Sequence, residues 1–290
     1  MIPASFDYVR PGSLDEVLAL LRDREGEAKI LSGGYSLLPL MKLRLAQPAL
    51  VVDLQAVTGL DGIARTDDWW RIGGRATHRA ILEHGALTAD HASIHDAAGG
   101  IGDPQVRNWG TIGGSCAHAD PSSDWPAVLQ ALGASFVLRS AAGERVVPAR
   151  GFFVDAFQTG IEPTEVMTEV RVPVAVPRMG SSYVKLERRA GDFATVGAAA
   201  ALTLGADGRI AAAGLALTAV GDAPFVAAAA EAQLTGSAPD EAAFAAAADA
   251  AAAAARPVAD GHGPADYKLA MAREITLRAL RLAATRAMTA

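Results

Sequence analysis

Hydrophobic residues recur at helical spacing near both ends of the chain. The first group is Leu14, Val17, Leu18 and Leu21. Ser13 precedes this group and stands three residues before Glu16, as in a capping box, so an amphipathic helix is predicted there. Near the C-terminus, a helix from about Asp266 would place three apolar residues on one face, namely Ile275, Ala279 and Leu282.

Strand-like runs follow the first of these helices. Apolar runs at 29–31 and 50–54 flank a turn that contains glycine, which predicts a small β-α-β unit ending near Ala56. Residues 69–74 predict a further strand, ended by Gly73-Gly74, and Thr77 is placed to cap the short helix after it.

In the second half of the chain the pattern favours hairpins and then helices. Residues 134–148 alternate around a central glycine turn. The runs 194–204 and 209–220 are joined through Asp207-Gly208, a typical hairpin turn, and are rich in small residues that would let helices pack closely on the sheet. Residues 227–255 are rich in alanine and are broken by glycine and proline, which predicts two helices.

Two segments combine paired glycines with hydroxyl residues. Ser32-Gly33-Gly34-Tyr35-Ser36 follows a strand and precedes a helix start, and Thr111-Ile112-Gly113-Gly114-Ser115 is predicted to form a second glycine turn. Without a Cβ, backbone N–H groups in such turns can approach a phosphate, and two turns suit a ligand with two phosphates. Neither segment fits the dinucleotide G-x-G-x-x-G fingerprint or the phosphate loop that ends in Gly-Lys-Ser/Thr.

A third polar segment lies downstream of the second glycine turn. Ser122-Ser123-Asp124 leads into the predicted helix 125–132, and Gly133 marks its end. A carboxylate at a helix start can accept a hydrogen bond from a ligand hydroxyl or cap the helix, and both roles stay open for Asp124.

Together these motifs resemble the FAD-binding medium subunit of molybdenum hydroxylases, the carbon monoxide dehydrogenase or xanthine dehydrogenase flavoprotein family. The similarity also includes Tyr183-Val184-Lys185-Leu186-Glu187-Arg188-Arg189 and the segment from Tyr267 to Arg273. It implies an α+β fold with a two-lobed PCMH-type (vanillyl-alcohol-oxidase-like) FAD-binding domain over 1–177, with lobes 1–56 and 57–177. A C-terminal antiparallel sheet packed with helices would occupy 178–290.

The resemblance also implies the residues that hold FAD. Lys29 to Ser36 would wrap the diphosphate and ribityl part. Thr111, Gly114 and Ser115 would serve the other side of the diphosphate, and Lys185 would lie near the pyrimidine edge of the flavin. The cofactor-binding set is Lys29, Ile30, Leu31, Ser32, Gly33, Gly34, Tyr35, Ser36, Ile101, Thr111, Gly114, Ser115, His118, Ser123, Asp124, Ile161, Lys185 and Phe193. Core packing is the competing role for Ile101, Ile161 and Phe193. Relatives usually carry His or Gln at the position of Tyr35.

Composition narrows the class of protein. The 290 residues are 51% hydrophobic and 20% charged, with no apolar run near the length of a membrane span, so a soluble protein of two or three domains is expected. No secretory leader is recognised at the N-terminus. The net charge of −6 and the lack of Lys/Arg clusters argue against a nucleic-acid surface.

The single cysteine, Cys116, excludes a disulfide framework and an iron-sulfur cluster held by this chain alone, and it indicates a cytoplasmic protein. Cys116 itself is predicted to be a small buried hydrophobe. The histidines at 78, 84, 91 and 95 lack convincing metal spacing, so surface or capping roles are predicted for them. His118 is a possible FAD contact without a covalent link.

The resemblance implies an oxidoreductase subunit that needs no catalytic side chain or metal of its own. Electrons would pass from a large molybdenum-cofactor subunit, through iron-sulfur clusters of a small subunit, to FAD here and then to an external acceptor. A dimer of heterotrimers is expected. Two alternatives are a stand-alone FAD-dependent oxidoreductase acting on a small substrate and a structural subunit without flavin. The substrate of the complex and the final acceptor are left open by the sequence.

Overall fold

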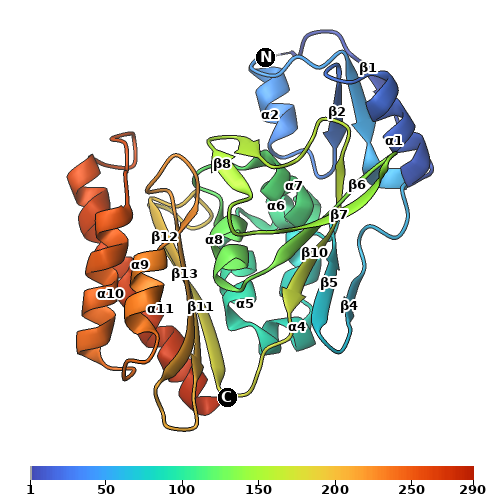
Figure 1. Ribbon diagram of the computed structural model, residues 1–290. Coiled ribbons are helices and arrows are strands. Elements are labelled where there is room, and N and C mark those ends of the chain that lie inside the picture. The colour runs from blue at the N-terminus through green and yellow to red at the C-terminus, as the bar shows by residue number, and fades with distance from the viewer. Residues whose placement is uncertain (1) are drawn as a thin grey trace.

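Residues 2–56 fold as a parallel β-α-β unit, shown in blue in Figure 1. In the computed structural model, which describes residues 2–290, the strand order is β1 (Asp7–Val9), β3 (Leu50–Asp53), β2 (Ala28–Leu31), and all pairs are parallel. Strand β3 is buried at every position, whereas β2 is only partly buried, contrary to the prediction of two buried strands. The outer strand β1 has no counterpart in the sequence prediction.

Helix α1 (Leu14–Asp23) covers this small sheet as predicted and buries Val17, Leu18 and Leu21. The Glu16 N–H donates to Ser13 Oγ at 3.3 Å, and the Glu16 carboxylate accepts from Gly12 N at 2.8 Å. The capping box is therefore formed with its return bond one residue earlier than the standard pattern. Helix α2 (Leu37–Lys42) and the short 3-10 turn η1 (Leu54–Ala56) complete the unit.

The central part of the chain builds a five-stranded antiparallel sheet with helices on one side. Its strand order is β4-β5-β10-β6-β7. The strands are β4 (Ile63–Arg65), β5 (Trp69–Gly73), β10 (Val166–Pro173), β6 (Ser135–Ser140) and β7 (Gly143–Pro148). The predicted strand at 69–74 and the predicted hairpin at 134–148 are confirmed, and a two-stranded ribbon, β8 (Phe153–Asp155) and β9 (Gln158–Thr159), is added.

Six short helices fill the stretch between β5 and β6. They are α3 (His78–Leu82), α4 (Gly85–Asp90), α5 (Ala92–Gly100), α6 (Pro104–Trp109), α7 (Ile112–His118) and α8 (Asp124–Ala131). Thr77 caps α3 as predicted, since its hydroxyl accepts from Ala80 N at 3.1 Å. Gly133 has φ of +66°, the left-handed conformation that ends α8.

The C-terminal part is a four-stranded antiparallel sheet covered on one face by long helices. Strands β11 (Met179–Leu186), β12 (Val196–Leu204), β13 (Ile210–Thr218) and β14 (Phe225–Val226) pair in chain order. Helices α9 (Ala228–Leu234), α10 (Glu241–Ala254) and α11 (Ala265–Thr289) lie on the outer face, orange to red in Figure 1, and α5 and α8 contact the inner face. The predicted hairpin and helices are confirmed.

Small residues let the helices approach this sheet closely, as predicted. A Cβ at Gly180 of β11 would collide with the α11 backbone, and one at Gly214 of β13 would collide with the Ala131 carbonyl of α8. Ile275 and Ala279 of α11 are buried, but Leu282 is 36% exposed and was wrongly placed on the packing face. The buried stripe of α11 instead continues through Leu280, Ala283 and Ala287 and leaves Leu282 at its flank.

The predicted α+β class is confirmed: parallel and antiparallel sheets occur in separate parts of the chain and are packed with helices. Each of the three larger sheets has its own hydrophobic cluster. The central cluster includes Trp125 and Phe136, and it also contains Ala199 and Ala216 of the C-terminal sheet, so the two larger parts share apolar packing. Across residues 2–290, no helix is both long enough and apolar enough to cross a lipid bilayer.

Candidate functional site

The first glycine segment turns sharply between β2 and α2. Gly34 has φ of +85°, a conformation that other residues adopt only with strain. At Gly33 a Cβ would collide with the backbone carbonyl of Trp109, the last residue of α6. Both glycines are therefore required, one by its backbone conformation and the other by the close approach of a second chain segment.

The second glycine segment forms a helix start, where the sequence predicted a turn. Thr111 is the N-cap of α7, and its Oγ1 accepts from Gly114 N at 3.1 Å. Gly113 donates to the Gly74 carbonyl at 2.9 Å, and a Cβ on Gly113 would collide with Gly74. The pair Gly73-Gly74, predicted only to end a strand, thus also supports α7. Pattern analysis of the local sequence could not show this contact between distant segments.

The two glycine segments meet in space. Ser32 Oγ and Thr111 Oγ1 are 2.9 Å apart and share a hydrogen bond between residues separated by 79 positions. The Ser32 Cβ also lies beside the position that a Cβ would occupy on Gly114. The predicted residues Ser32, Gly33, Thr111 and Gly114 therefore form one structure, which we call the glycine cradle (residues 32–36 and 111–115).

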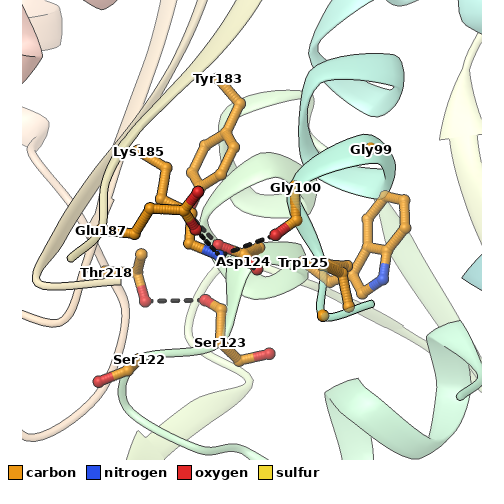
Figure 2. A network of polar contacts seen from close by, with 12 residues as sticks. Gly99, Gly100, Ser122, Ser123, Asp124, Trp125, Tyr183, Lys185, Glu187 and Thr218 are labelled. Atoms are coloured by element: carbon orange, nitrogen blue, oxygen red, sulfur yellow. Dashed lines mark hydrogen bonds and ion pairs between the residues drawn. The ribbon is translucent and has the colours of Figure 1, made fainter. Parts of the chain in front are cut away.

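The cradle continues toward the C-terminal sheet through a chain of polar contacts. Ser115 Oγ is 2.8 Å from Ser123 Oγ, and the Ser123 carbonyl accepts from Thr218 Oγ1 at 2.8 Å. Asp124, the first residue of α8, accepts from Tyr183 through Oδ1 at 2.5 Å and from Lys185 Nζ through Oδ2 at 3.3 Å. Figure 2 shows this group, with Lys185 and Tyr183 pointing from β11 toward Asp124.

Lys185 has further partners beside Asp124. Its Nζ donates to the Gly100 carbonyl at the end of α5 at 3.0 Å and lies 3.3 Å from Glu187 Oε2. The Lys185 side chain is 8% exposed and the Asp124 side chain 7%, so this ion pair is shielded from water. Tyr183 and Glu187 were not among the predicted site residues, although both stand in the motif that carried the resemblance.

Burial dominates the electrostatics of this group. It raises the pKa of Asp124, against the opposite effect of the Lys185 ammonium and the Tyr183 hydroxyl. It also raises the pKa of Tyr183 well above its usual value, and the adjacent Asp124 carboxylate acts in the same direction. Tyr183 is therefore a neutral hydrogen-bond donor at any physiological pH.

Three aromatic side chains in the cradle or in loops and helix ends outside it are exposed. Tyr35, Trp109 and Phe193 are 43%, 53% and 55% exposed. The loop that carries Phe193 lies close to the end of α5, since a Cβ added to Gly191 would collide with the Gly102 carbonyl. Trp109 was missed by the sequence prediction, which has no signal for the exposure of a single aromatic residue.

The other predicted residues lie on several different elements. Lys29 is exposed on β2, Ser36 is the N-cap position of α2, and Ile161 packs on the central core. The Ile101 carbonyl accepts from Arg107 at 3.0 Å. The His118 ring lies 5.0 Å from the Phe157 ring, and burial lowers the pKa of His118.

Two of the other histidines do not have the predicted surface or capping roles. His78 is buried, accepts from Trp125 Nε1 through Nδ1 at 3.0 Å, and has its pKa lowered by burial to about 4. His91 is also buried and its Nε2 is 2.7 Å from the Pro173 carbonyl, whereas His84 does cap α4.

Within residues 2–290 no group of three or more His, Cys, Asp or Glu side chains could hold a metal ion. Cys116 is fully buried, as predicted, and burial raises the pKa of its thiol.

The geometry fits a ligand with a diphosphate. Ser32, Thr111 and Ser115 offer hydroxyl groups at one place, and the glycines there let the two segments approach closely enough to bring these groups together. A buried ammonium stands at the other end of the polar chain. The arrangement can bind an anionic group at the cradle and stabilise negative charge near Lys185.

Comparisons with known proteins agree over the whole chain. Residues 4–175 match the family model described as the FAD binding domain in molybdopterin dehydrogenase, and residues 181–283 match the CO dehydrogenase flavoprotein C-terminal domain. The carbon monoxide dehydrogenase medium chain of Afipia carboxidovorans is 41% identical over 287 residues, covering 99% of each chain. Subunit alpha of the 6-hydroxypseudooxynicotine dehydrogenase complex of Paenarthrobacter nicotinovorans is 37% identical, covering 99% of this chain and 97% of its own length.

Solved structures give the same result. A chain of carbon monoxide dehydrogenase from Hydrogenophaga pseudoflava superposes with a TM-score of 0.96 at 43% identity, covering 99% of both chains. A chain of quinoline 2-oxidoreductase from Pseudomonas putida 86 superposes with a TM-score of 0.92 at 36% identity, covering 99% of this chain and all of that one.

Proposed function

The chain belongs to the family of FAD-binding medium subunits of molybdenum hydroxylases, and we propose that it carries electrons from a partner subunit to an external acceptor. It is an oxidoreductase subunit whose cofactor is FAD. When bound, FAD supplies redox chemistry that can link one-electron clusters to a two-electron acceptor. The chain's own part is to bind the cofactor, shield it and set its electrostatic surroundings.

The observation that carries this proposal is the junction of the two glycine segments. Gly33 packs on the Trp109 carbonyl, and Ser32 shares a hydrogen bond with Thr111. Close backbone packing accounts for Gly33 and Gly113, but the junction also gathers the hydroxyl groups of Ser32, Thr111 and Ser115, which suit the diphosphate of FAD. Residues 29–36 would hold one side of the diphosphate and residues 111–115 the other, and Lys185 would face the flavin.

We assign the remaining predicted residues secondary contacts with FAD. Ser123 and Asp124 would lie along the ribityl chain, although both Asp124 oxygens already accept bonds from β11. Tyr35 and Phe193 would cover the cofactor with their exposed rings. Ile101, His118 and Ile161 would line its apolar parts. We take 1–177 as the FAD-binding domain, with lobes 1–56 and 57–177, and 178–290 as the second domain.

The single cysteine supports the placement of the iron-sulfur clusters on another subunit. Four cysteines usually hold an iron-sulfur cluster, and the sequence has one, which is buried. We therefore assign the clusters to a small subunit and the molybdenum cofactor to a large subunit, assembled as a cytoplasmic dimer of heterotrimers. Electrons would enter from the clusters of the small subunit.

Substitution of Gly33 tests the cradle directly. In Gly33→Ala the new Cβ meets the Trp109 backbone, which has no flexible atoms to move aside. A clash of this kind costs about 1–3 kcal/mol and is relieved by a shift of the 32–36 segment. FAD binding must then restore the original position of the segment against this cost, so FAD affinity should fall about 10- to 100-fold. Gly62→Ala is the matched control, because no atom lies within 4 Å of its new Cβ. Equal FAD affinity in both variants, measured by flavin fluorescence during titration, would exclude the cradle as the binding site.

The electron-transfer role is tested by visible spectroscopy of the chain purified alone and co-expressed with the products of neighbouring genes. Flavin absorbance that bleaches with the substrate of the complex only when partners are present supports the subunit role. Bleaching of the isolated chain by a small substrate would instead identify a self-contained flavoenzyme.

A further inference from the structure

The charges around Lys185 do not balance. Its ammonium pairs with Asp124 at 3.3 Å and stands equally close to Glu187 Oε2. One positive charge therefore faces two carboxylates. Figure 2 shows Glu187 on the side of Lys185 that faces away from Gly100. Three elements place polar groups around Lys185. Helix α5 supplies the Gly100 carbonyl and α8 supplies Asp124, while Tyr183 lies on β11 and Glu187 directly follows it.

Asp124 and Glu187 are held in different ways. Both Asp124 oxygens accept hydrogen bonds, from Tyr183 and from Lys185, so its negative charge is compensated. Glu187 Oε2 is buried, yet no hydrogen-bond donor within residues 2–290 satisfies it, because Lys185 is near but not aligned with it. No hydrogen bond requires the carboxylate at this position, so Glu187 is poorly explained as a structural residue.

We propose that Glu187 is a positioning residue that offsets the charge of Lys185 and thereby lowers the redox potential of the bound FAD. The inference rests on the FAD site proposed above. Reduction by two electrons and one proton adds one negative charge to the cofactor. The Lys185 ammonium favours that charge, and a carboxylate 3.3 Å from the ammonium opposes it. Because the Asp124 carboxylate is already compensated by Tyr183 and Lys185, the charge of Glu187 sets the net charge of this group beside the flavin.

The test is the midpoint potential of FAD in the co-expressed complex, measured at equilibrium with a dye of known potential. Glu187→Gln keeps the shape of the side chain and removes its charge. We expect the ratio of reduced to oxidised FAD at a fixed potential to rise about tenfold, which is about 30 mV for a two-electron couple. Lys185→Met should move the potential in the opposite direction.

Two further variants separate charge from shape. Glu187→Asp keeps the charge and should hold a potential nearer the wild type than Glu187→Gln does. Glu231→Gln is the matched control in α9, where the carboxylate pairs with Arg150 at 2.6 Å. The inference is overturned if the midpoint potential of Glu187→Gln equals that of Glu231→Gln. It is also overturned if Glu187→Asp and Glu187→Gln shift the midpoint potential by the same amount. Absence of FAD from the wild-type complex would overturn the proposed function itself.

Discussion

Single buried residues carry much of the chemistry of this chain, and His78 is the clearest case. It lies between Trp125, whose Nε1 donates to it, and the backbone of Gly110, which has no room for a Cβ beside the imidazole. Gly110 directly precedes Thr111 of the glycine cradle. The neutral imidazole therefore packs against the residue that precedes the cradle, although His78 is not part of the cradle.

Loss of stability in mild acid is the expected consequence. Burial lowers the pKa of His78 in the folded state to about 4, from 6.5 for the free side chain. Between these values the unfolded chain binds the proton and the folded chain does not, so the free energy of unfolding falls as the pH drops through this window. From pH 7 to pH 5 the loss attributable to His78 should be about 2 kcal/mol.

Urea titrations of the wild type and of His78→Gln at both pH values measure this loss. Glutamine cannot titrate, and its amide oxygen can still accept from Trp125. The variant should therefore lose about 2 kcal/mol less than the wild type on acidification. An equal loss in both proteins would mean that folding does not lower the pKa of His78.

At the scale of helices and strands, local patterns predicted most elements but not their contacts. The hairpin of β12 and β13, the two alanine-rich helices and the cap of α3 all follow from periodicity and turn residues within a few positions. The prediction of a turn at Gly113 and Gly114 was wrong, because these residues begin a helix whose position depends on contacts with Gly74 and Ser32, far away in sequence. Likewise, nothing near Leu282 shows that the sheet meets α11 along its alanine stripe.

Capping of α10 is a prediction at this scale. Its interior is almost entirely alanine, and Asp240 is the N-cap, accepting from Ala243 N at 3.0 Å. Asp240→Ala should lower the free energy of unfolding by about 1 kcal/mol, whereas Asp240→Asn, which keeps the acceptor, should lower it by a few tenths. Chemical denaturation followed by circular dichroism measures both. A loss in Asp240→Asn as large as in Asp240→Ala would assign the effect to charge rather than to the cap.

Across the whole molecule, the proposed site depends on how the two larger parts of the chain are joined. Lys185 belongs to the C-terminal sheet, and the cradle belongs to the earlier part of the chain. Asp124 links β11 to α8, and Asp96 of α5 makes a second link, since it accepts from Arg286 at 2.6 and 3.1 Å and from Tyr183 N at 3.0 Å. Both links fix β11, so the position of Lys185 follows from the junction of the two parts.

Breaking the second link should separate the unfolding of the two parts. Asp96→Ala leaves the Tyr183 N–H without its acceptor and the Arg286 guanidinium with only the Ser181 carbonyl, at a cost of about 2 kcal/mol. All four tryptophans, Trp69, Trp70, Trp109 and Trp125, lie in the first part, so their fluorescence reports only its unfolding. Circular dichroism also reports α10 and α11. In the variant we expect the dichroism to change at lower denaturant than the fluorescence, whereas in the wild type the two curves should coincide.

The matched control removes an ion pair within one part. Asp249 of α10 pairs with Arg273 of α11 at 2.5 Å, and both lie in the C-terminal part. Asp249→Ala should lower stability by less than about 1 kcal/mol, because the pair is exposed, and should keep the two curves together. If Asp96→Ala also keeps them together, the shared apolar packing of α8 against β12 and β13 is sufficient to join the parts. In that case Lys185 would hold its place without Asp96, and FAD binding would be insensitive to this link.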